Sequence, residues 1–177
     1  MAGKQWVFAY GSLIWDPGFP WTDRLPARLY GYHRAFCIHS WHYRGSRHAP
    51  GLVLGLDRGG SCRGVAYGVA TEDWREVVAY LDAREMVTSV YVPRDVSIHI
   101  PGKRGCGQIC ARAYVTARPH EQYAGRVALA DQARIITHAR GHGGANVDYL
   151  HNTLEHLRAM HIHDPRLEAV ARLLPKR

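Results

Sequence analysis

Long apolar runs are absent from this 177-residue sequence. None approaches the ~20 residues that a helix needs to cross a bilayer. The N-terminal stretch is polar and is interrupted by aromatic residues and a glycine, unlike a secretory signal peptide. Four cysteines are present without a CxxC pair, and we expect Cys37 and Cys62 to be packing residues. These features predict a cytoplasmic protein whose cysteines are thiols.

Charges of one sign do not cluster, although the formal net charge is +8 and the pI is near 9.6. No block of five or more like charges occurs, and no basic run alternates with regularly spaced aromatic residues. Attraction of a small anion explains the positive charge more simply, so we expect no nucleic-acid partner and no membrane partner. A nucleic-acid-binding domain is an alternative that salt-dependent retention on DNA would support.

The common cofactor and metal motifs are missing as well. Neither GxGxxG nor GxxxxGK[ST] occurs, which argues against a nucleotide cofactor. His138 and His142 are four residues apart, but Gly141 interrupts the helix on which they would have to lie. The other histidine pairs lack carboxylate or thiolate partners at zinc spacing. We therefore expect no cofactor and no metal site.

The order of the predicted elements indicates an α+β fold in a single domain that spans residues 1–177. Strand patterns dominate the first two thirds of the chain and helical patterns the last third. The strands are not separated by regular crossover helices, which excludes a doubly wound sheet. We expect a mixed, curved or barrel-like sheet flanked by helices. Predicted strands cover 7–10, 27–38, 52–56, 64–70, 90–100 and 108–116, and predicted helices cover 72–85, 125–139 and 165–174. A further helix is predicted after Asn146, with Leu150, Leu154 and Leu157 on one face.

Several turns and caps follow from residue type. Residues 16–26 hold three prolines and a glycine and are predicted to be a loop. Residues 57–60 and 101–105 are predicted to be turns between strands. Thr71 and Asn146 are predicted to cap the helices that follow them.

The segment Tyr10-Gly11-Ser12-Leu13 ends the first predicted strand. A glycine there lets the backbone turn sharply and approach a ligand closely, and successive N–H groups in such a turn form an anion-binding concavity. The alternative is a simple strand exit. Ser12 is not expected to be a covalent nucleophile, because the nucleophile elbow needs glycines where this chain has Tyr10 and Ile14.

Glu85 lies at the end of the amphipathic helix predicted after residue 71. The negative end of the helix dipole disfavours a carboxylate and raises its pKa, which suits a general base that works near neutral pH. The alternative is a frayed surface glutamate paired with Arg84.

Eight segments carry a family resemblance, and they follow one another along nearly the whole chain: WVFAYGSLIWDP at 6–17, GLVLGLDRGGSCRGVA at 51–66, REM at 84–86, VYVP at 90–93, QYAG at 122–125, RGHGG at 140–144, DYL at 148–150 and IHD at 162–164. In this order they resemble ChaC-type γ-glutamylcyclotransferases of the bacterial branch. The resemblance implies the γ-glutamylcyclotransferase-like fold.

The resemblance also implies an activity and a site. The implied reaction is that of a lyase, in which the substrate's own α-amine attacks its γ-carbonyl and glutathione becomes 5-oxoproline and Cys-Gly. Glu85 corresponds to the catalytic glutamate. The substrate-binding residues implied are Tyr10, Gly11, Ser12, Leu13 and Tyr91. Other γ-glutamyl amino acids or amines are alternative substrates, and a non-catalytic regulatory binding module is the alternative function.

Overall fold

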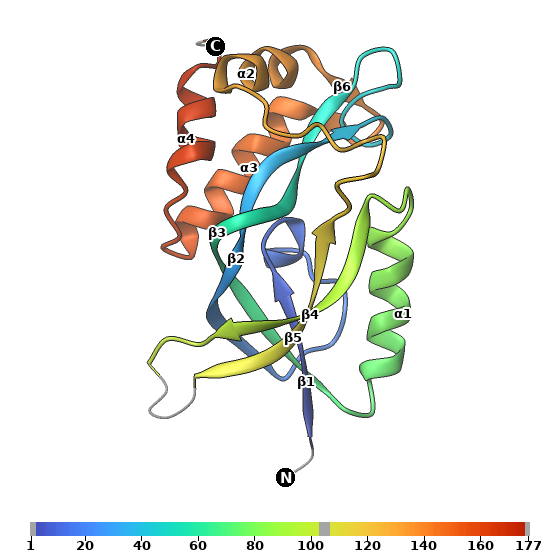
Figure 1. Cartoon of the computed structure of the whole chain (residues 1–177), viewed down its shortest axis with the longest axis vertical. Helices are drawn as coiled ribbons and strands as arrows, with labels where there is room; N and C mark the ends of the chain where they lie inside the picture. The colour runs from blue at the N-terminus through green and yellow to red at the C-terminus, as the bar shows by residue number, and fades with distance from the viewer. Residues whose placement is uncertain (1–2, 103–106, 176–177) are drawn as a thin grey trace. The chain divides into compact units, whose positions relative to one another are not determined.

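The computed structural model describes residues 3–102 and 107–175. They belong to two compact units: the first comprises residues 1–34 and 56–117, and the second residues 35–55 and 118–177. In chain order the elements (Figure 1) are β1 (Lys4–Ala9), the 3-10 turn η1 (Ser12–Ile14), β2 (Asp23–Ser40), β3 (Gly51–Ala70), α1 (Trp74–Glu85), β4 (Tyr91–His99), β5 (Gln108–Thr116), α2 (Leu129–His138), β6 (Arg140–Gly141), β7 (Gly144–Ala145), α3 (Asn146–Ala159) and α4 (Pro165–Arg172).

The first unit is built on a closed barrel with the strand order β1-β3-β2-β4-β5. β1 runs antiparallel to β3, from the pair Lys4↔Ala70 onward. It runs parallel to β5 at the pair Val7↔Arg112, which closes the barrel. The sheet is therefore mixed and curved, and the predicted α+β class is confirmed.

Apolar residues fill the inside of the barrel because they alternate along its strands. On β5, Ala111, Ala113 and Val115 are buried in this core. α1 lies alongside the barrel (Figure 1) and buries Val77 and Leu81. The core also takes residues from the other strands and from the positions just after them: Phe8, Tyr10, Ala27, Leu29, Leu56, Cys62, Ala66, Val96, Ile98 and Ile100.

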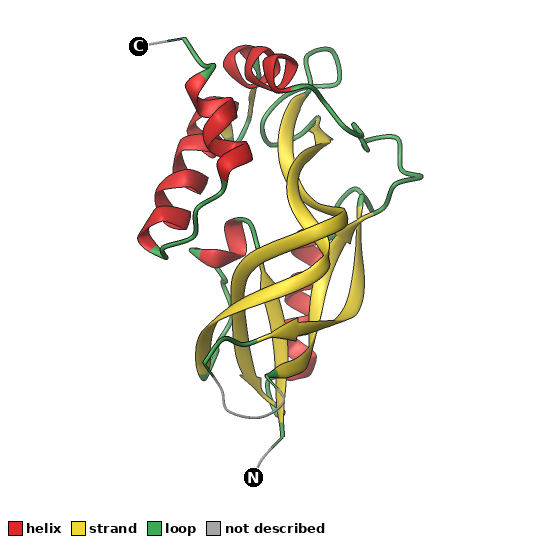
Figure 2. Ribbon diagram, turned by 60° about the vertical axis from the view of Figure 1, so that its left-hand side comes forward, coloured by secondary structure: helices red, strands yellow, loops and turns green. Residues whose placement is uncertain are grey.

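The second unit contains helices α2, α3 and α4, which pack against one another (Figure 2). Leu150, Leu154 and Leu157 recur at helical spacing on α3 and are buried there. The segment after residue 118 joins the same unit through an isolated bridge between Ile38 and Tyr123. Among the described residues, no helix combines the length and the apolar character that crossing a membrane requires.

The predicted hairpin at residues 57–60 is wrong. β3 runs without a break from Gly51 to Ala70. Gly59 and Gly60 do take positive φ values, +98° and +69°, as glycines in turns often do. They do so inside a continuing strand, because the later half of β3 pairs with β1 rather than with the earlier half.

Both predicted helix caps are also wrong. α1 begins at Trp74, and the Thr71 hydroxyl donates to the carbonyl of Gly3 instead of capping it. Asn146 is the first residue of α3, and its side chain pairs with the backbone of Leu52, accepting from the N–H at 2.7 Å and donating to the carbonyl at 2.8 Å. A buried amide needs such partners more than the helix end needs a cap.

Other boundaries differ by a few residues. The loop predicted over 16–26 ends early, because β2 already begins at Asp23. The helix predicted over 125–139 begins only at Leu129, after Gly125 with φ +65°. The turn predicted at 101–105 and Cys106 lie wholly or partly outside the described residues. Cys37 and Cys62 are buried, as predicted.

Candidate active site

The turn after β1 is anchored on both sides of Tyr10. The Tyr10 hydroxyl donates to the carbonyl oxygen of Tyr114 at 2.9 Å. The carbonyl of Tyr10 accepts from Nε of Arg34 at 2.6 Å, and Arg34 is itself buried. The chain then enters η1, in which the N–H of Ile14 donates to the carbonyl of Gly11 at 2.9 Å. The backbone at Gly11 and Ser12 is thus held by fixed neighbours.

The first N–H groups of this turn have no acceptor within the turn itself. The opening N–H groups of a helical turn have no partner inside it. In the described part of the chain, the backbone hydrogen bonds of the turn are donated by Ile14 and the two residues after it. The N–H groups of Gly11, Ser12 and Leu13 are therefore available as donors to an anionic or carbonyl oxygen.

Glu85 is the last residue of α1, as predicted, and its side chain is only 17% exposed. Burial raises the pKa of this carboxyl, and the neighbouring Arg84 guanidinium partly opposes that rise. The predicted rise in the pKa of Glu85 is confirmed, but its largest cause is burial and not the helix dipole. Glu85 is not the frayed surface residue of the alternative interpretation, although it does pair with Arg84, with 3.4 Å between Nε and Oε1.

Arg84 joins the turn to the acid. One terminal nitrogen of its guanidinium donates to the carbonyl of Asp16 at 2.8 Å and to the hydroxyl of Tyr80 at 2.9 Å. The other donates to Oγ of Ser12 at 3.3 Å. Because Nε faces Glu85, Ser12 and Glu85 contact the same planar group. The structure thus places the turn beside the acid within the first unit.

Comparison with known proteins identifies the family. The profile of the family described as ChaC-like protein matches residues 5–177. This chain belongs to the ChaC family.

Two relatives of this chain are named for their activity on glutathione. The glutathione-specific γ-glutamylcyclotransferase of Escherichia coli K12 is 32% identical over 165 residues, which cover 93% of this chain and 70% of the relative. The mouse glutathione-specific γ-glutamylcyclotransferase 1 is 36% identical over 147 residues, which cover 82% of this chain and 66% of the relative.

A solved structure shares the fold of this ChaC-family chain. The crystal structure of a yeast γ-glutamyl cyclotransferase specific to glutathione superposes with a TM-score of 0.84. The superposition covers 97% of each chain at 24% sequence identity. The predicted γ-glutamylcyclotransferase-like fold is confirmed by this likeness.

The predicted site residues of this ChaC-family chain lie in one unit, but their contacts differ. Ser12 and Glu85 meet at Arg84, and Tyr10 is fixed beneath the turn. Tyr91 is half-buried and begins β4 opposite Thr116. The roles assigned to these residues and to Gly11 and Leu13 remain predictions.

Sequence reasoning missed a polar cluster one helical turn before Glu85. Asp82 on α1 contacts Arg112 and Tyr114, both on β5. Its signal in the sequence is faint: Arg112 and Tyr114 alternate with the apolar residues of β5, so they share the face opposite the barrel core. Nothing local to Asp82 indicates that this face lies beside α1.

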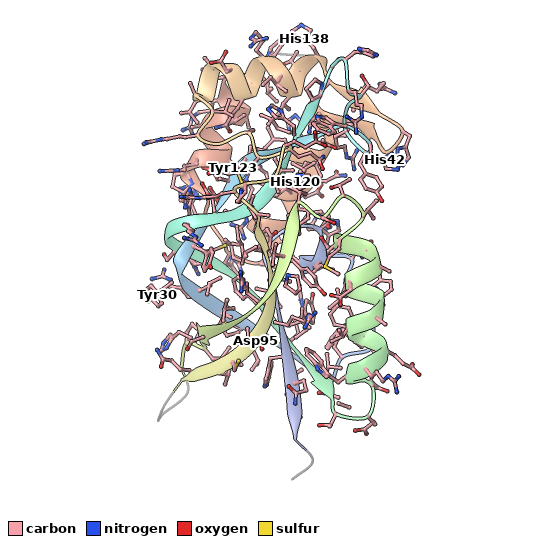
Figure 3. All side chains as sticks on the ribbon, turned by 45° about the vertical axis from the view of Figure 1, so that its right-hand side comes forward. Tyr30, His42, Asp95, His120, Tyr123 and His138 are labelled. Atoms are coloured by element: carbon pink, nitrogen blue, oxygen red, sulfur yellow. The ribbon has the colours of Figure 1, made fainter. Side chains whose placement is uncertain are left out.

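Histidines do not gather into a metal site in the described ranges 3–102 and 107–175. No group of three or more His, Cys, Asp or Glu side chains there is placed to hold a metal ion. His42 and His142 pack ring against ring at 4.3 Å between centroids. His138 lies apart from His42, on α2 (Figure 3).

Proposed function

We propose that this chain is a γ-glutamylcyclotransferase that acts on glutathione and releases 5-oxoproline and Cys-Gly. Membership of the ChaC family supports this function. The observation that carries it is the guanidinium of Arg84, which contacts Ser12 of the turn and Glu85 of α1 at once. One folded γ-glutamyl group is short enough to meet both the turn and the acid.

The reaction needs little beyond positioning and proton transfer. The substrate's α-amine attacks its own γ-carbonyl, so the reacting groups already share one molecule and the effective molarity is high once the chain is curled. The turn supplies N–H donors at Gly11, Ser12 and Leu13 for the γ-glutamyl group and for the oxyanion that forms on the carbonyl. One lost donor of this kind costs about 10²–10³ in rate.

Glu85 is the proposed general base. It takes a proton from the substrate's ammonium group, which frees the amine to attack, and returns a proton to the leaving amine of Cys-Gly. A carboxyl whose pKa burial has raised exchanges protons more effectively near neutral pH than an ordinary one. Proton transfer of this kind contributes about 10²–10⁴-fold.

Tyr91 is proposed to line the pocket at the start of β4. It follows the buried Val90, whose carbonyl accepts from the N–H of Ala117 at 2.8 Å, so the strand entry is fixed. A half-buried tyrosine offers both an apolar ring and a hydroxyl to a peptide substrate.

We further propose that both units form one catalytic domain over residues 1–177, because the family match runs through both of them. The proposed partner is the small molecule alone, with no nucleic acid and no membrane. The proposed location is the cytoplasm, where the thiols of Cys37, Cys62 and Cys110 would stay reduced. The net charge of +8 suits attraction of an anionic tripeptide.

The test is incubation of the full chain with reduced glutathione, followed by chromatography for 5-oxoproline and Cys-Gly. Equal rates with and without EDTA are expected, because the mechanism uses only groups of the protein and the substrate. A parallel panel of γ-glutamyl amino acids and γ-glutamylamines tests the alternative substrates. Binding without turnover of any of these compounds would indicate a regulatory module instead.

A further inference from the structure

A compact polar cluster ties the last turns of α1 to β5. The hydroxyl of Tyr114 donates to Oδ1 of Asp82 at 2.5 Å. One terminal nitrogen of Arg112 donates to both carboxylate oxygens of Asp82, at 3.0 and 3.2 Å. The Nε of Arg112 also donates to the Tyr114 hydroxyl at 3.3 Å, so each member contacts the other two.

Two members of the cluster, Arg112 and Tyr114, lie on the barrel strand β5, and the third, Asp82, lies on α1. Tyr114 is 1% exposed and sits on a barrel strand whose alternate residues fill the core. Burial, and then the hydrogen bond to Asp82, raises the pKa of the Tyr114 phenol, so it keeps its proton and remains a donor at neutral pH. Asp82 on α1 is thus held by two groups of the barrel strand β5.

Tyr114 also contacts the other half of the site. Its backbone carbonyl accepts the hydrogen bond of the Tyr10 hydroxyl, at the head of the turn. Its side chain holds Asp82, which precedes Glu85 by three positions on α1. Residues three apart on a helix are neighbours, with about 5–6 Å between their Cβ atoms. A single residue of β5 thus fixes both the turn and the helix end that carries the acid.

We infer that Asp82, Arg112 and Tyr114 are positioning residues that set where Glu85 stands relative to the Tyr10–Leu13 turn. The inference rests on the proposed function, in which Glu85 is the base. Misplacement of a reacting group by 1 Å can cost about 10²-fold in rate. Arg84 links the acid to the turn directly, and the cluster adds a second link that runs through β5.

Two single-atom changes test the inference. Tyr114→Phe removes the hydroxyl and keeps the ring, and Asp82→Asn removes the charge and keeps the shape. We expect kcat for glutathione to fall about 10- to 100-fold in each variant while KM changes less than about threefold, because the acid moves and the turn stays. The matched control is Asp131→Asn, which breaks an exposed ion pair with Arg134 on α2 and should leave kcat unchanged.

A double-mutant cycle separates positioning from a general structural effect. If the cluster acts through Glu85, Asp82→Asn should add less than about twofold to the loss already caused by Glu85→Gln. Equal loss in both backgrounds, or an unchanged kcat in Tyr114→Phe, would overturn the inference. Should Asp82→Asn fail to fold, Arg112→Lys replaces it, since it keeps the charge but lacks the Nε–H that contacts Tyr114.

Amide hydrogen exchange gives a readout that does not depend on turnover. Exchange in the peptide over residues 82–86 should speed up in Tyr114→Phe, while exchange in η1 stays as in the parent chain. Unchanged exchange over 82–86 would also overturn the inference. An inactive parent chain with this exchange pattern would instead refute the proposed function and leave the cluster's anchoring role standing.

Discussion

Ser12 and Glu85 lie far apart in the sequence, yet both contact the guanidinium of Arg84, at 3.3 Å from Oγ and 3.4 Å from Oε1. Arg84 also holds the carbonyl of Asp16 and the hydroxyl of Tyr80. One planar cation therefore contacts both the turn that presents N–H donors and the carboxylate that would accept a proton.

Replacement of Arg84 by methionine should move the pH dependence of activity. The Arg84 charge lowers the pKa of Glu85 against the larger effect of burial, so its removal should raise that pKa further. A base must be deprotonated to act, and the acid limb of kcat/KM should therefore shift to higher pH. Arg84→Lys keeps the charge and should shift the limb less. An acid limb that stays in place, or moves to lower pH, would show that Arg84 does not act on Glu85.

Changes in the turn should differ in severity. Ser12→Ala removes one long hydrogen bond to Arg84 and leaves the amides in place, so we expect less than about a tenfold loss in kcat/KM. Gly11→Val places a branched side chain in the turn and should cost about 10²-fold or more, as a lost oxyanion donor does. Steady-state kinetics with glutathione measure both. A larger loss for Ser12→Ala than for Gly11→Val would indicate that the Ser12 hydroxyl, rather than the backbone amides, stabilises the transition state.

Ionisation of Glu85 should lower the free energy of unfolding. Burial raises its pKa in the folded chain above the unfolded value, so the folded state binds the proton more tightly. Stability therefore falls as pH rises from the unfolded to the folded pKa, and it stays lower above that window. Glu85→Gln should have the higher Tm at pH 8, and the difference should shrink at pH 4. Thermal melts at the two pH values check this, and a less stable Gln variant at pH 8 would contradict it.

β1 and β3 approach each other closely at Ala9, just before the turn. A Cβ at Gly64 would lie 2.2 Å from the carbonyl oxygen of Ala9 and 2.9 Å from Cζ of Phe8. Gly64→Ala must therefore push β1 away from β3, and overpacking of this kind costs about 1–3 kcal/mol. Gly3→Ala is the control, because its Cβ would meet only the Thr71 hydroxyl oxygen at 3.5 Å. Urea unfolding measures both, and equal stability of the two variants would refute the tight contact.

Local patterns predicted the features that local physics determines. The strand over 108–116 agrees with β5, because alternation of apolar and polar residues follows from the pleat itself. The helix before Glu85 ends where predicted, since its apolar residues recur at helical spacing up to Leu81. The turn at Gly11 likewise follows directly from its place at the end of β1.

Features that depend on contacts between residues far apart in the sequence could not be predicted from local patterns. Gly59 and Gly60 suit a hairpin as well as a continuing strand, and the pairing of β3 with β1 decides between them. Asn146 has the residue type of a cap, but Leu52 offers it a buried backbone pair. The contact between Asp82 and Tyr114 joins a helix to a strand whose proximity no local pattern encodes.

The role of Glu85 as the base is tested by comparing Glu85→Gln with the parent chain in two assays. Release of 5-oxoproline from glutathione gives turnover, and calorimetry with glutathione gives binding. We expect turnover to fall by about 10²–10⁴-fold while Kd stays within about threefold. Turnover by Glu85→Gln at the rate of the parent chain would contradict it.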